Sequence, residues 1–458
     1  MRPATAAPME EADAFLAAHP EIVAVDIFLI DPNGIPRGKT IRRHELAALY
    51  RDGRHLPGSI LGLDITGADV EETGLVWSDG DADRRGWPVP GSLKLAPWTT
   101  PPRAQVQLTL HELDGSPMAA DPRHALARQA DRLKADNRHP VMAFELEFYL
   151  LDRQPGPDGR PQPARLPLTG ERPEMIQVYG TEALDRLSPF TEEVYRAAAV
   201  QGLPLETLIS EYAPGQYELT LHHRGNALQA ADDLVGLKRL LKAMAARAGM
   251  IACFMAKPFP GLAGSGMHLH VSLADSDGRN RFADPAAGTL APELTASIAG
   301  LLATLPEAML IFAPHLNSWR RFAVGSYAPT APTWGINNRS VAVRVPAGSA
   351  AGRHLEQRMA GVDANPYLVG AVTLAAMRAG LAAGADPGPA TAHYAPDATD
   401  ILPPDWRDAI VTAGRSAFLK EALGERLHHV LLALKRAEYR LFAGEVTEME
   451  YRRTLESF

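Results

Sequence analysis

The sequence predicts an α+β protein with two domains, at residues 1–113 and 114–458. Three observations predict this class. Strand-like segments near the N-terminus are joined by a Pro-Gly turn, long segments with helical periodicity follow, and later strands begin at glycine-rich turns. A chain of 458 residues is also long enough to bury two hydrophobic cores.

The first domain is expected to contain one helix and at least three strands. Residues 11–19 have helical spacing, and EIVAVDIFLI and IPRGKTI read as two strands. Pro32-Asn33-Gly34 supplies the turn between these strands. VQLTLHEL at 106–113 is a further strand, so we expect the domain to end near residue 113.

The second domain is expected to mix strands with longer helices. Asp121 before Pro122 is a suitable helix N-cap, because its side chain can accept a hydrogen bond from the first turn. The Pro- and Gly-rich stretch at 153–173 is expected to be a loop. The remaining patterns predict helices at 191–202, 227–249 and 416–444 and strands at 144–150, 211–223 and 266–273.

Composition and charge exclude several classes of function. The net charge of −8 gives no basic excess for nucleic acid or an anionic membrane. The single cysteine, Cys253, permits no intramolecular disulfide, which is typical of a reducing compartment. The apolar stretch at 368–385 contains Arg378 and predicts a packed internal helix rather than a membrane span. With no signal-peptide pattern at the N-terminus, we expect a cytoplasmic protein.

The segment FELEFYL at 144–150 places two carboxylates in an apolar strand. Glu145 and Glu147 are two positions apart, so they share one face of that strand. A buried carboxylate is costly unless something neutralises it. Same-face neighbours lie about 6.5–7 Å apart, whereas tight two-metal clamps hold ions about 3.5–4 Å apart. We therefore expect these two glutamates to serve different ions.

Other acids and histidines join them in strand-like segments. EYAPGQYE carries Glu211 and Glu218, GSGMHLH carries His268 and His270, and RHLEQR carries Glu356. Each alone has an ordinary explanation, as a solvated acid, a structural histidine or a surface ion pair. Together, several carboxylates with histidines and no thiolates favour a hard divalent cation, Mg²⁺ or Mn²⁺, with two or more per site.

Paired arginines follow these segments along the chain. They are Arg320 and Arg321, Arg339 and Arg344, and Arg353 and Arg358. Arginine forks match phosphates and carboxylates. Because the sequence has no GxxxxGK[ST] loop, we expect a nucleotide and an anionic substrate to be held outside P-loop chemistry.

The motif order ELEFYL, EYAPGQYE, GSGMHLHVSL, NSWRRF, NNRSVAVRVP and RHLEQRMAGVDANPYL resembles the glutamine synthetase superfamily over about residues 20–455. Within it, the chain is most similar to the gamma-glutamylputrescine synthetases. The resemblance implies an N-terminal β-grasp domain and a catalytic domain of antiparallel strands with surrounding helices. It also implies a homododecamer of two hexameric rings, with active sites between subunits.

The resemblance also implies roles for individual residues. Glu145, His268 and Glu356 would bind the metal at the ATP phosphates, and Glu147, Glu211 and Glu218 the metal near glutamate. Arg321, Arg358 and Gly264 would hold glutamate, and Arg339 and Arg344 the transferred phosphate. His270 and Ser272 would lie on the nucleotide side, with Arg353 as a further nucleotide contact.

The chemistry implied is activation of glutamate by ATP, giving γ-glutamyl phosphate, which a small amine then attacks. Ammonia-using members have two acids near the amine, and here Leu56 and Tyr327 fall at those positions. Losing those acids favours an organic amine, with putrescine or a polyamine as the leading expectation. The alternatives are an ammonia-using glutamine synthetase, a ligase for ethanolamine, isopropylamine or an arylamine, and a non-catalytic assembly.

Overall fold

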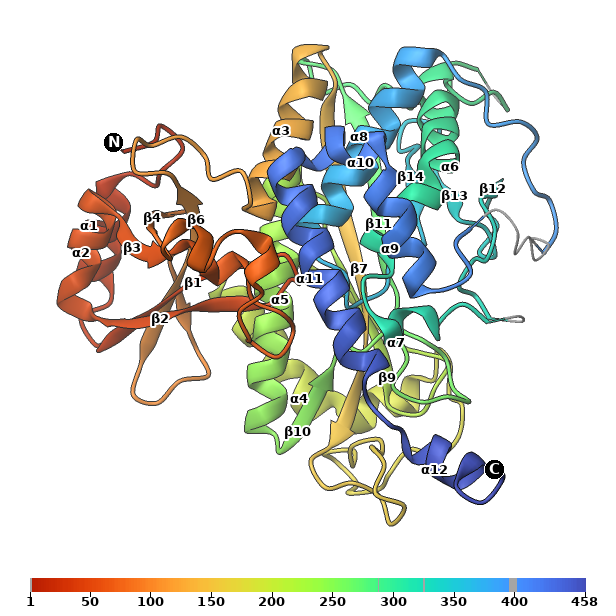
Figure 1. The fold of residues 1–458 in the computed structure, drawn as a ribbon, viewed down its shortest axis with the longest axis horizontal. Coiled ribbons are helices and arrows are strands. Elements are labelled where there is room, and N and C mark those ends of the chain that lie inside the picture. Colours follow the sequence, from red (N-terminus) through yellow and green to blue (C-terminus); the bar gives the residue numbers. More distant parts are fainter. Residues whose placement is uncertain (1, 287, 324–325, 395–401) are drawn as a thin grey trace.

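The computed structural model describes residues 2–286, 288–323, 326–394 and 402–458, and it shows an α+β chain with two β-sheets (Figure 1). The smaller sheet, drawn in red to orange, lies to one side, and the larger sheet runs through the body of the molecule. This arrangement confirms the predicted fold class.

The N-terminal sheet has the strand order β2-β1-β6-β4-β3, with β5 pairing with β6. β1 and β6 are parallel, and the other pairs are antiparallel. The strand–turn–strand unit expected at the start of this domain is present, with β1 and β2 as its two strands. The elements are α1 Met9–Ala18, β1 Ala24–Ile30, β2 Pro36–Arg42, α2 Leu46–Asp52, β3 Arg54–Pro57, β4 Asp83–Pro88, β5 Lys94–Ala96 and β6 Arg103–His111.

The turn between β1 and β2 docks on a helix from the far end of the chain, α11 (Glu425–Ala443). Gly34 has a φ of +77°, which the turn requires and a β-carbon would strain. Asn33 donates a hydrogen bond from Nδ2 to Glu438 Oε1 at 2.8 Å. Lys435 Nζ lies 2.9 Å from Glu438 Oε2, and neither side chain of this ion pair is exposed. A buried polar cluster therefore joins the N-terminal turn to the C-terminal helix.

The larger sheet has the order β12-β13-β14-β11-β7-β9-β8, with β10 pairing with β7. Only β12 and β13 among these pairs are parallel. Its strands are β7 His139–Asp152, β8 Leu205–Ser210, β9 Gln216–Leu221, β10 Met250–Cys253, β11 Met267–Ala274, β12 Trp334–Ile336, β13 Val343–Val345 and β14 Leu355–Gln357.

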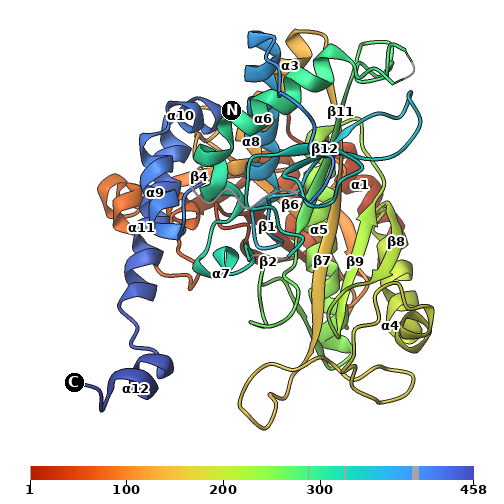
Figure 2. The same cartoon turned by 90° about the vertical axis from the view of Figure 1, so that its right-hand side faces the viewer.

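Helices cover this sheet and fill the body beside it (Figure 2). α5 packs on β7 and β10, and α8 packs on both α3 and α6. The helices are α3 Pro122–Ala135, α4 Thr181–Val200, α5 Ala227–Arg247, α6 Pro292–Phe312, α7 Leu316–Trp319, α8 Pro366–Ala383, α9 Trp406–Arg415, α10 Ala417–Leu423 and α12 Glu448–Thr454. α12 projects from the body in both views.

Three hydrophobic clusters of described residues form the core. The largest spans residues from Phe28 to Leu432 and centres on the larger sheet, and the second is N-terminal, from Ala7 to Ala120. The third is small and consists of Tyr149, Leu151, Ala213 and Cys253. Val430 and Leu434 of α11 complete the N-terminal cluster. The change of cluster near residue 120 lies close to the boundary proposed at residue 113.

Two helices, α6 and α8, are long and apolar enough to span a membrane by composition. The two helices pack against each other, and 67% and 72% of their most apolar 18-residue stretches are buried. The expectation that residues 368–385 form a packed internal helix is therefore confirmed by α8.

Several element boundaries differ from the prediction. Asp121 does cap α3, since its carboxylate accepts a hydrogen bond from Arg123 N at 2.9 Å. α4 begins ten positions earlier than expected, at Thr181, because Pro189 is accommodated inside the helix. The expected helix at 416–444 is two helices, divided at Gly424 with a φ of +80°.

Candidate active site

The strand β7 presents its two glutamates on one face, as predicted. Alternate residues of this strand point into the core, where Phe144, Leu146 and Phe148 are buried. Glu145 and Glu147 occupy the opposite, half-buried face. The apolar residues of FELEFYL thus anchor the strand, while its acids line an open side of the sheet.

The register of the sheet brings further acids and histidines beside them. Glu147 lies opposite Glu218 of β9, and Glu145 lies opposite His268 of β11. On the next strand pair, His270 lies opposite Glu356 of β14. Five of the six predicted metal ligands, all but Glu211, therefore come from four adjacent strands. Glu211 follows β8 directly and reaches the same group, because its charge interacts with those of Glu147 and Glu145.

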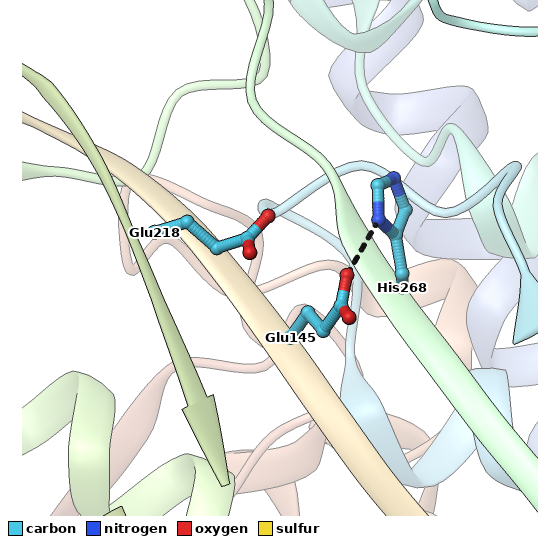
Figure 3. Close-up of side chains that lie close together, drawn as sticks. All are labelled: Glu145, Glu218 and His268. Atoms are coloured by element: carbon cyan, nitrogen blue, oxygen red, sulfur yellow. Dashed lines mark hydrogen bonds and ion pairs between the residues drawn. The ribbon is translucent and has the colours of Figure 1, made fainter. Parts of the chain in front are cut away.

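Glu145 lies at the centre of this cluster. Its Oε2 is 3.2 Å from His268 Nδ1 (Figure 3). Its Oε1 is 2.9 Å from His270 Nε2. Burial alone would raise the pKa of Glu145, but the two imidazoles outweigh burial and hold that pKa well below its usual range. This carboxylate is ionised and faces the open side of the sheet.

Glu356 is the fully buried acid of the cluster, and arginines compensate its charge. Arg344 Nη1 lies 2.9 Å from Glu356 Oε2, and Arg358 contacts the other oxygen. Burial favours the protonated acid, but Arg358 and the histidines lower the pKa of Glu356 to about 2. Arg344, Arg358 and Glu356 are thus held together before any ligand binds.

On the opposite side of the cluster, the charges of Glu218 and Glu211 are not compensated by arginines in this way. Burial, followed by the charges of Glu145 and Glu147, raises the pKa of Glu218 to about 9. Burial and Glu147 raise the pKa of Glu211 to about 7. Burial and the neighbouring carboxylates therefore keep Glu218 protonated at neutral pH, and a cation placed there would release that proton.

The donor set fits hard divalent cations. Two groups of side chains bring their ligand atoms within 4.8 Å of one another: Glu145, Glu218 and His268, and Glu145, His270 and Glu356. Carboxylates with one imidazole suit Mg²⁺ or Mn²⁺. Figure 3 shows the first group with its side chains converging. The expected division of the ligands between two metals differs in detail from these groups and stays a prediction.

A glycine-rich turn before β11 allows Arg321 to approach the cluster. A β-carbon on Gly264 would lie 2.7 Å from Arg321 Cγ and 2.8 Å from Ala256 O. Gly266 N donates a hydrogen bond to Glu147 Oε2 at 2.7 Å, and a β-carbon there would lie 2.7 Å from His268 Nε2. Arg321 is buried and donates to the carbonyls of Arg358 and Met359 at 3.0 and 2.8 Å. Gly264 thus has a steric reason to be glycine beside Arg321.

A cavity of about 490 Å³ opens beside Glu145 and His270. Ser272 lines it, as expected for a nucleotide-side residue, and so does His354. His354 Nε2 lies 3.1 Å from His270 Nδ1 and fixes that ring. His354 was not among the predicted site residues, and the alternation of RHLEQR around Glu356 was the signal that could have found it.

The remaining predicted arginines lie in different settings. Arg353 forms a bidentate ion pair with Asp284 through Nε and Nη2, at 3.0 and 2.6 Å, and is not among the residues that line the cavity. Arg339 is exposed, and its charge is felt by Glu211. Arg353 as a nucleotide contact and Arg339 as a phosphate contact both stay predictions.

Comparison with known proteins matches this chain to one family by sequence and by structure. Residues 119–454 match the family model for the glutamine synthetase catalytic domain. The chain belongs to the glutamine synthetase family. Members of this family are ligases that typically use ATP and divalent metals.

The relatives cover nearly the whole chain. Gamma-glutamylputrescine synthetase PuuA of Escherichia coli is 38% identical, over 96% of this chain and 93% of that protein. Gamma-glutamylethanolamide synthetase GlnA4 of Streptomyces coelicolor is 32% identical, over 98% and 96%. The solved structure of a GmaS/ADP complex superposes with a TM-score of 0.81 at 28% identity, covering 97% of this chain and 99% of that one.

The two positions that depart from ammonia-using members of the family have different surroundings. Leu56 was expected to face the amine, but its side chain is 1% exposed and packs in the N-terminal cluster. The alternation of β3 explains this, since its neighbour His55 is exposed while Leu56 faces inward. Leu56 therefore offers no side chain to a ligand.

Tyr327 is instead 57% exposed, and its ring lies 5.8 Å from that of Tyr212. Tyr212 directly follows Glu211, whose carboxylate accepts a hydrogen bond from its backbone N–H at 3.1 Å. The sequence argument did not single out Tyr212. An aromatic pair therefore borders the uncompensated side of the carboxylate cluster.

Replacing Glu218 with glutamine should remove one falling contribution to the pH dependence of stability in the metal-free protein. The pKa of Glu218 is about 9 in the folded chain against an ordinary 4.5, so the folded chain holds a proton that the unfolded chain has lost. Glu218 should therefore lower stability as the pH rises between these values. Above about pH 7, where Glu211 has also titrated, Lys238 and Lys242 contribute in the opposite sense, because their pKa values are lowered in the folded chain. The lysine contribution is common to both proteins, so the stability of the variant should rise relative to that of the parent protein as the pH increases. Glu218→Gln has no such proton to lose. Thermal unfolding in EDTA at several pH values measures the slope.

The control is Glu10→Gln, which makes the same change on the exposed surface of α1. It should keep the slope of the parent protein. Equal slopes for all three proteins would show that Glu218 is not protonated in the folded chain.

Replacing Gly264 with alanine should raise the KM for glutamate, if Arg321 binds that substrate. The new methyl group would displace the Arg321 side chain, because it would lie closer than van der Waals contact allows. We expect a loss of about tenfold in kcat/KM for glutamate, with a smaller change in the KM for ATP. Gly261→Ala is the control, since its β-carbon would meet nothing within 4 Å. An unchanged glutamate KM in a folded Gly264→Ala enzyme would separate Arg321 from glutamate binding.

Proposed function

We propose that this protein is an ATP-dependent ligase that joins the γ-carboxylate of glutamate to an organic amine, with putrescine or another polyamine as the leading substrate. The similarity to a gamma-glutamylputrescine synthetase over nearly the full length supports this choice. The similarity to a gamma-glutamylethanolamide synthetase supports the broader class.

In the first step, an oxygen of the γ-carboxylate attacks the γ-phosphorus of ATP, and ADP leaves. Two or more Mg²⁺ or Mn²⁺ ions would neutralise negative charge on the phosphates when bound. Glu145, His268 and Glu356 would hold the ion at the phosphates, and Glu147, Glu211 and Glu218 the ion near glutamate. Arg344 and Arg339 would stabilise charge on the transferred group, while Arg321 and Arg358 hold the substrate.

In the second step, the neutral amine nitrogen attacks the acyl carbon of γ-glutamyl phosphate. The C–O bond to phosphate breaks, phosphate leaves, and the nitrogen loses one proton. The phosphate leaves readily from an acyl phosphate, whereas the free carboxylate has no comparable leaving group. His270 and Ser272 would border the nucleotide in this arrangement, in the cavity that both residues line.

The observation that carries the choice of an organic amine is the pair of exposed rings, Tyr212 and Tyr327, beside Glu211. Ammonium alone gains little from an aromatic surface compared with a ring of acids. A carbon chain can pack on these rings, and a distal ammonium group can lie over a ring face. The pair therefore suits a diamine better than it suits ammonia.

Phosphate release with ATP, Mg²⁺ and glutamate tests this proposal. The acceptors are ammonium, putrescine, spermidine, ethanolamine, isopropylamine and aniline. We expect putrescine or spermidine to exceed ammonium. Tyr327→Glu should shift the ratio of putrescine to ammonium activity toward ammonium by about tenfold, because it restores an acid and removes a ring. Tyr327→Phe, which keeps the ring, should retain the preference.

Other outcomes of this panel are equally informative. Greatest release with ammonium would identify a glutamine synthetase and contradict the reading of Tyr327. Greatest release with ethanolamine, isopropylamine or aniline would keep the ligase class and replace the amine. No release with any acceptor would favour a non-catalytic member of the family.

We also propose that the protein is a cytoplasmic homo-oligomer, with a dodecamer of two hexameric rings as the expected form. The projecting C-terminal segment supports this, because it exposes several large apolar side chains: Val446, Met449, Tyr451, Leu455 and Phe458. Native mass measurement should give twelve copies, and removing residues 446–458 should yield smaller species. A monomeric full-length protein would contradict the proposal.

A further inference from the structure

A second cavity lies between the N-terminal domain and helix α5. Its volume is about 610 Å³, within the range of small-molecule sites. The β1–β2 turn at 33–36 forms one wall, and α5 forms another. Trp98 and Phe254 contribute aromatic surface, and none of the metal, glutamate or nucleotide residues proposed above lines it.

Two lysines on successive turns of α5 converge in this cavity. Lys238 Nζ lies 5.3 Å and Lys242 Nζ 5.6 Å from the centroid of the Phe254 ring. Lys238 donates a hydrogen bond to Val362 O at 2.6 Å. Within the described ranges, neither ammonium group has a carboxylate within 4.0 Å. Two basic side chains are thus held close to one ring without a direct ion pair.

The other ionisable groups of the cavity do not offset the positive charge of Lys238 and Lys242. Arg239 is paired with Asp26, at 3.2 Å. His315 contacts the Lys435 and Glu438 pair. Asp363 brings one negative charge, and its Oδ2 accepts a hydrogen bond from Ser318. Two lysines therefore face the one carboxylate that lines the cavity in the described part of the chain, so positive charge exceeds negative charge there.

Burial and the charge of Lys242 lower the pKa of Lys238 to about 7, and burial also lowers the pKa of Lys242. The cavity therefore stabilises the ammonium form poorly as it stands. A bound anion would reverse this, because it supplies the missing opposite charge. Anion binding and protonation of the lysines should favour each other.

We propose that this cavity binds a small organic anion with at least two negative charges, carried by a phosphate ester or a dicarboxylate. Its charged group would lie between Lys238 and Lys242, where each ammonium can donate hydrogen bonds. Its carbon skeleton would pack against Phe254 and Trp98. This site does not depend on the acceptor amine of the ligase reaction.

The test measures binding of glucose 6-phosphate and of succinate to the full-length protein in EDTA, by calorimetry and by thermal shift. At least one of these dianions should bind and raise the unfolding temperature, while glucose and acetate at equal ionic strength should not. Lys242→Gln should weaken binding by about tenfold, since it removes one of two charged contacts. Lys242 is exposed at one side, so this variant should fold.

Lys420→Gln is the matched control, because it removes the same charge from the exposed surface of α10. It should bind as the parent protein does. Failure of both dianions at millimolar concentration would overturn the proposal, as would equal binding by the Lys242→Gln variant. A dianion held at the ligase site would give that equal binding, and it would be displaced by ATP or glutamate.

Discussion

Repulsion among buried carboxylates is the constraint on which this site depends. Glu145, Glu147, Glu218 and Glu356 converge on one face of a single sheet, with Glu211 at the end of a strand beside them, and the strand register holds them together. The repulsion between the carboxylates is relieved differently on the two sides of the cluster. Histidines and arginines keep Glu145 and Glu356 ionised, whereas Glu218 takes a proton. One side of the site is thus preorganised, and the other would be completed by a cation.

The asymmetry explains how one site could treat two anionic substrates in different ways. On the preorganised side, Arg344 already contacts Glu356, so phosphate groups would meet fixed positive charge. On the other side, positive charge would arrive with the metal, and the aromatic rings of Tyr212 and Tyr327 border the remaining space. Charge is therefore concentrated where phosphate moves, and apolar surface lies where a carbon chain would enter.

Local patterns in the sequence predicted the faces of single strands but not the pairing of strands. The alternation of FELEFYL was sufficient to place Glu145 and Glu147 together, because a strand has a period of two. The register that sets Glu147 against Glu218 depends on contacts between segments about seventy positions apart, which no local pattern encodes. The family resemblance supplied the grouping of Glu147 with Glu218. It also suggested that Leu56 lies at the amine site, but Leu56 is buried in the core of its own domain. Arg353 shows the same limit, since its partner Asp284 lies 69 positions away.

The buried contact between the β1–β2 turn and α11 has a consequence for how the chain is made. Asn33 and Glu438 are 405 positions apart, and Val430 and Leu434 complete the N-terminal hydrophobic cluster. A ribosome releases the N-terminal domain first, and domains tend to fold as they emerge. Here the first domain lacks part of its core until the last helices leave the ribosome. The nascent chain must therefore leave an apolar surface of the first domain exposed through most of its synthesis. A chaperone could bind to this surface until α11 covers it.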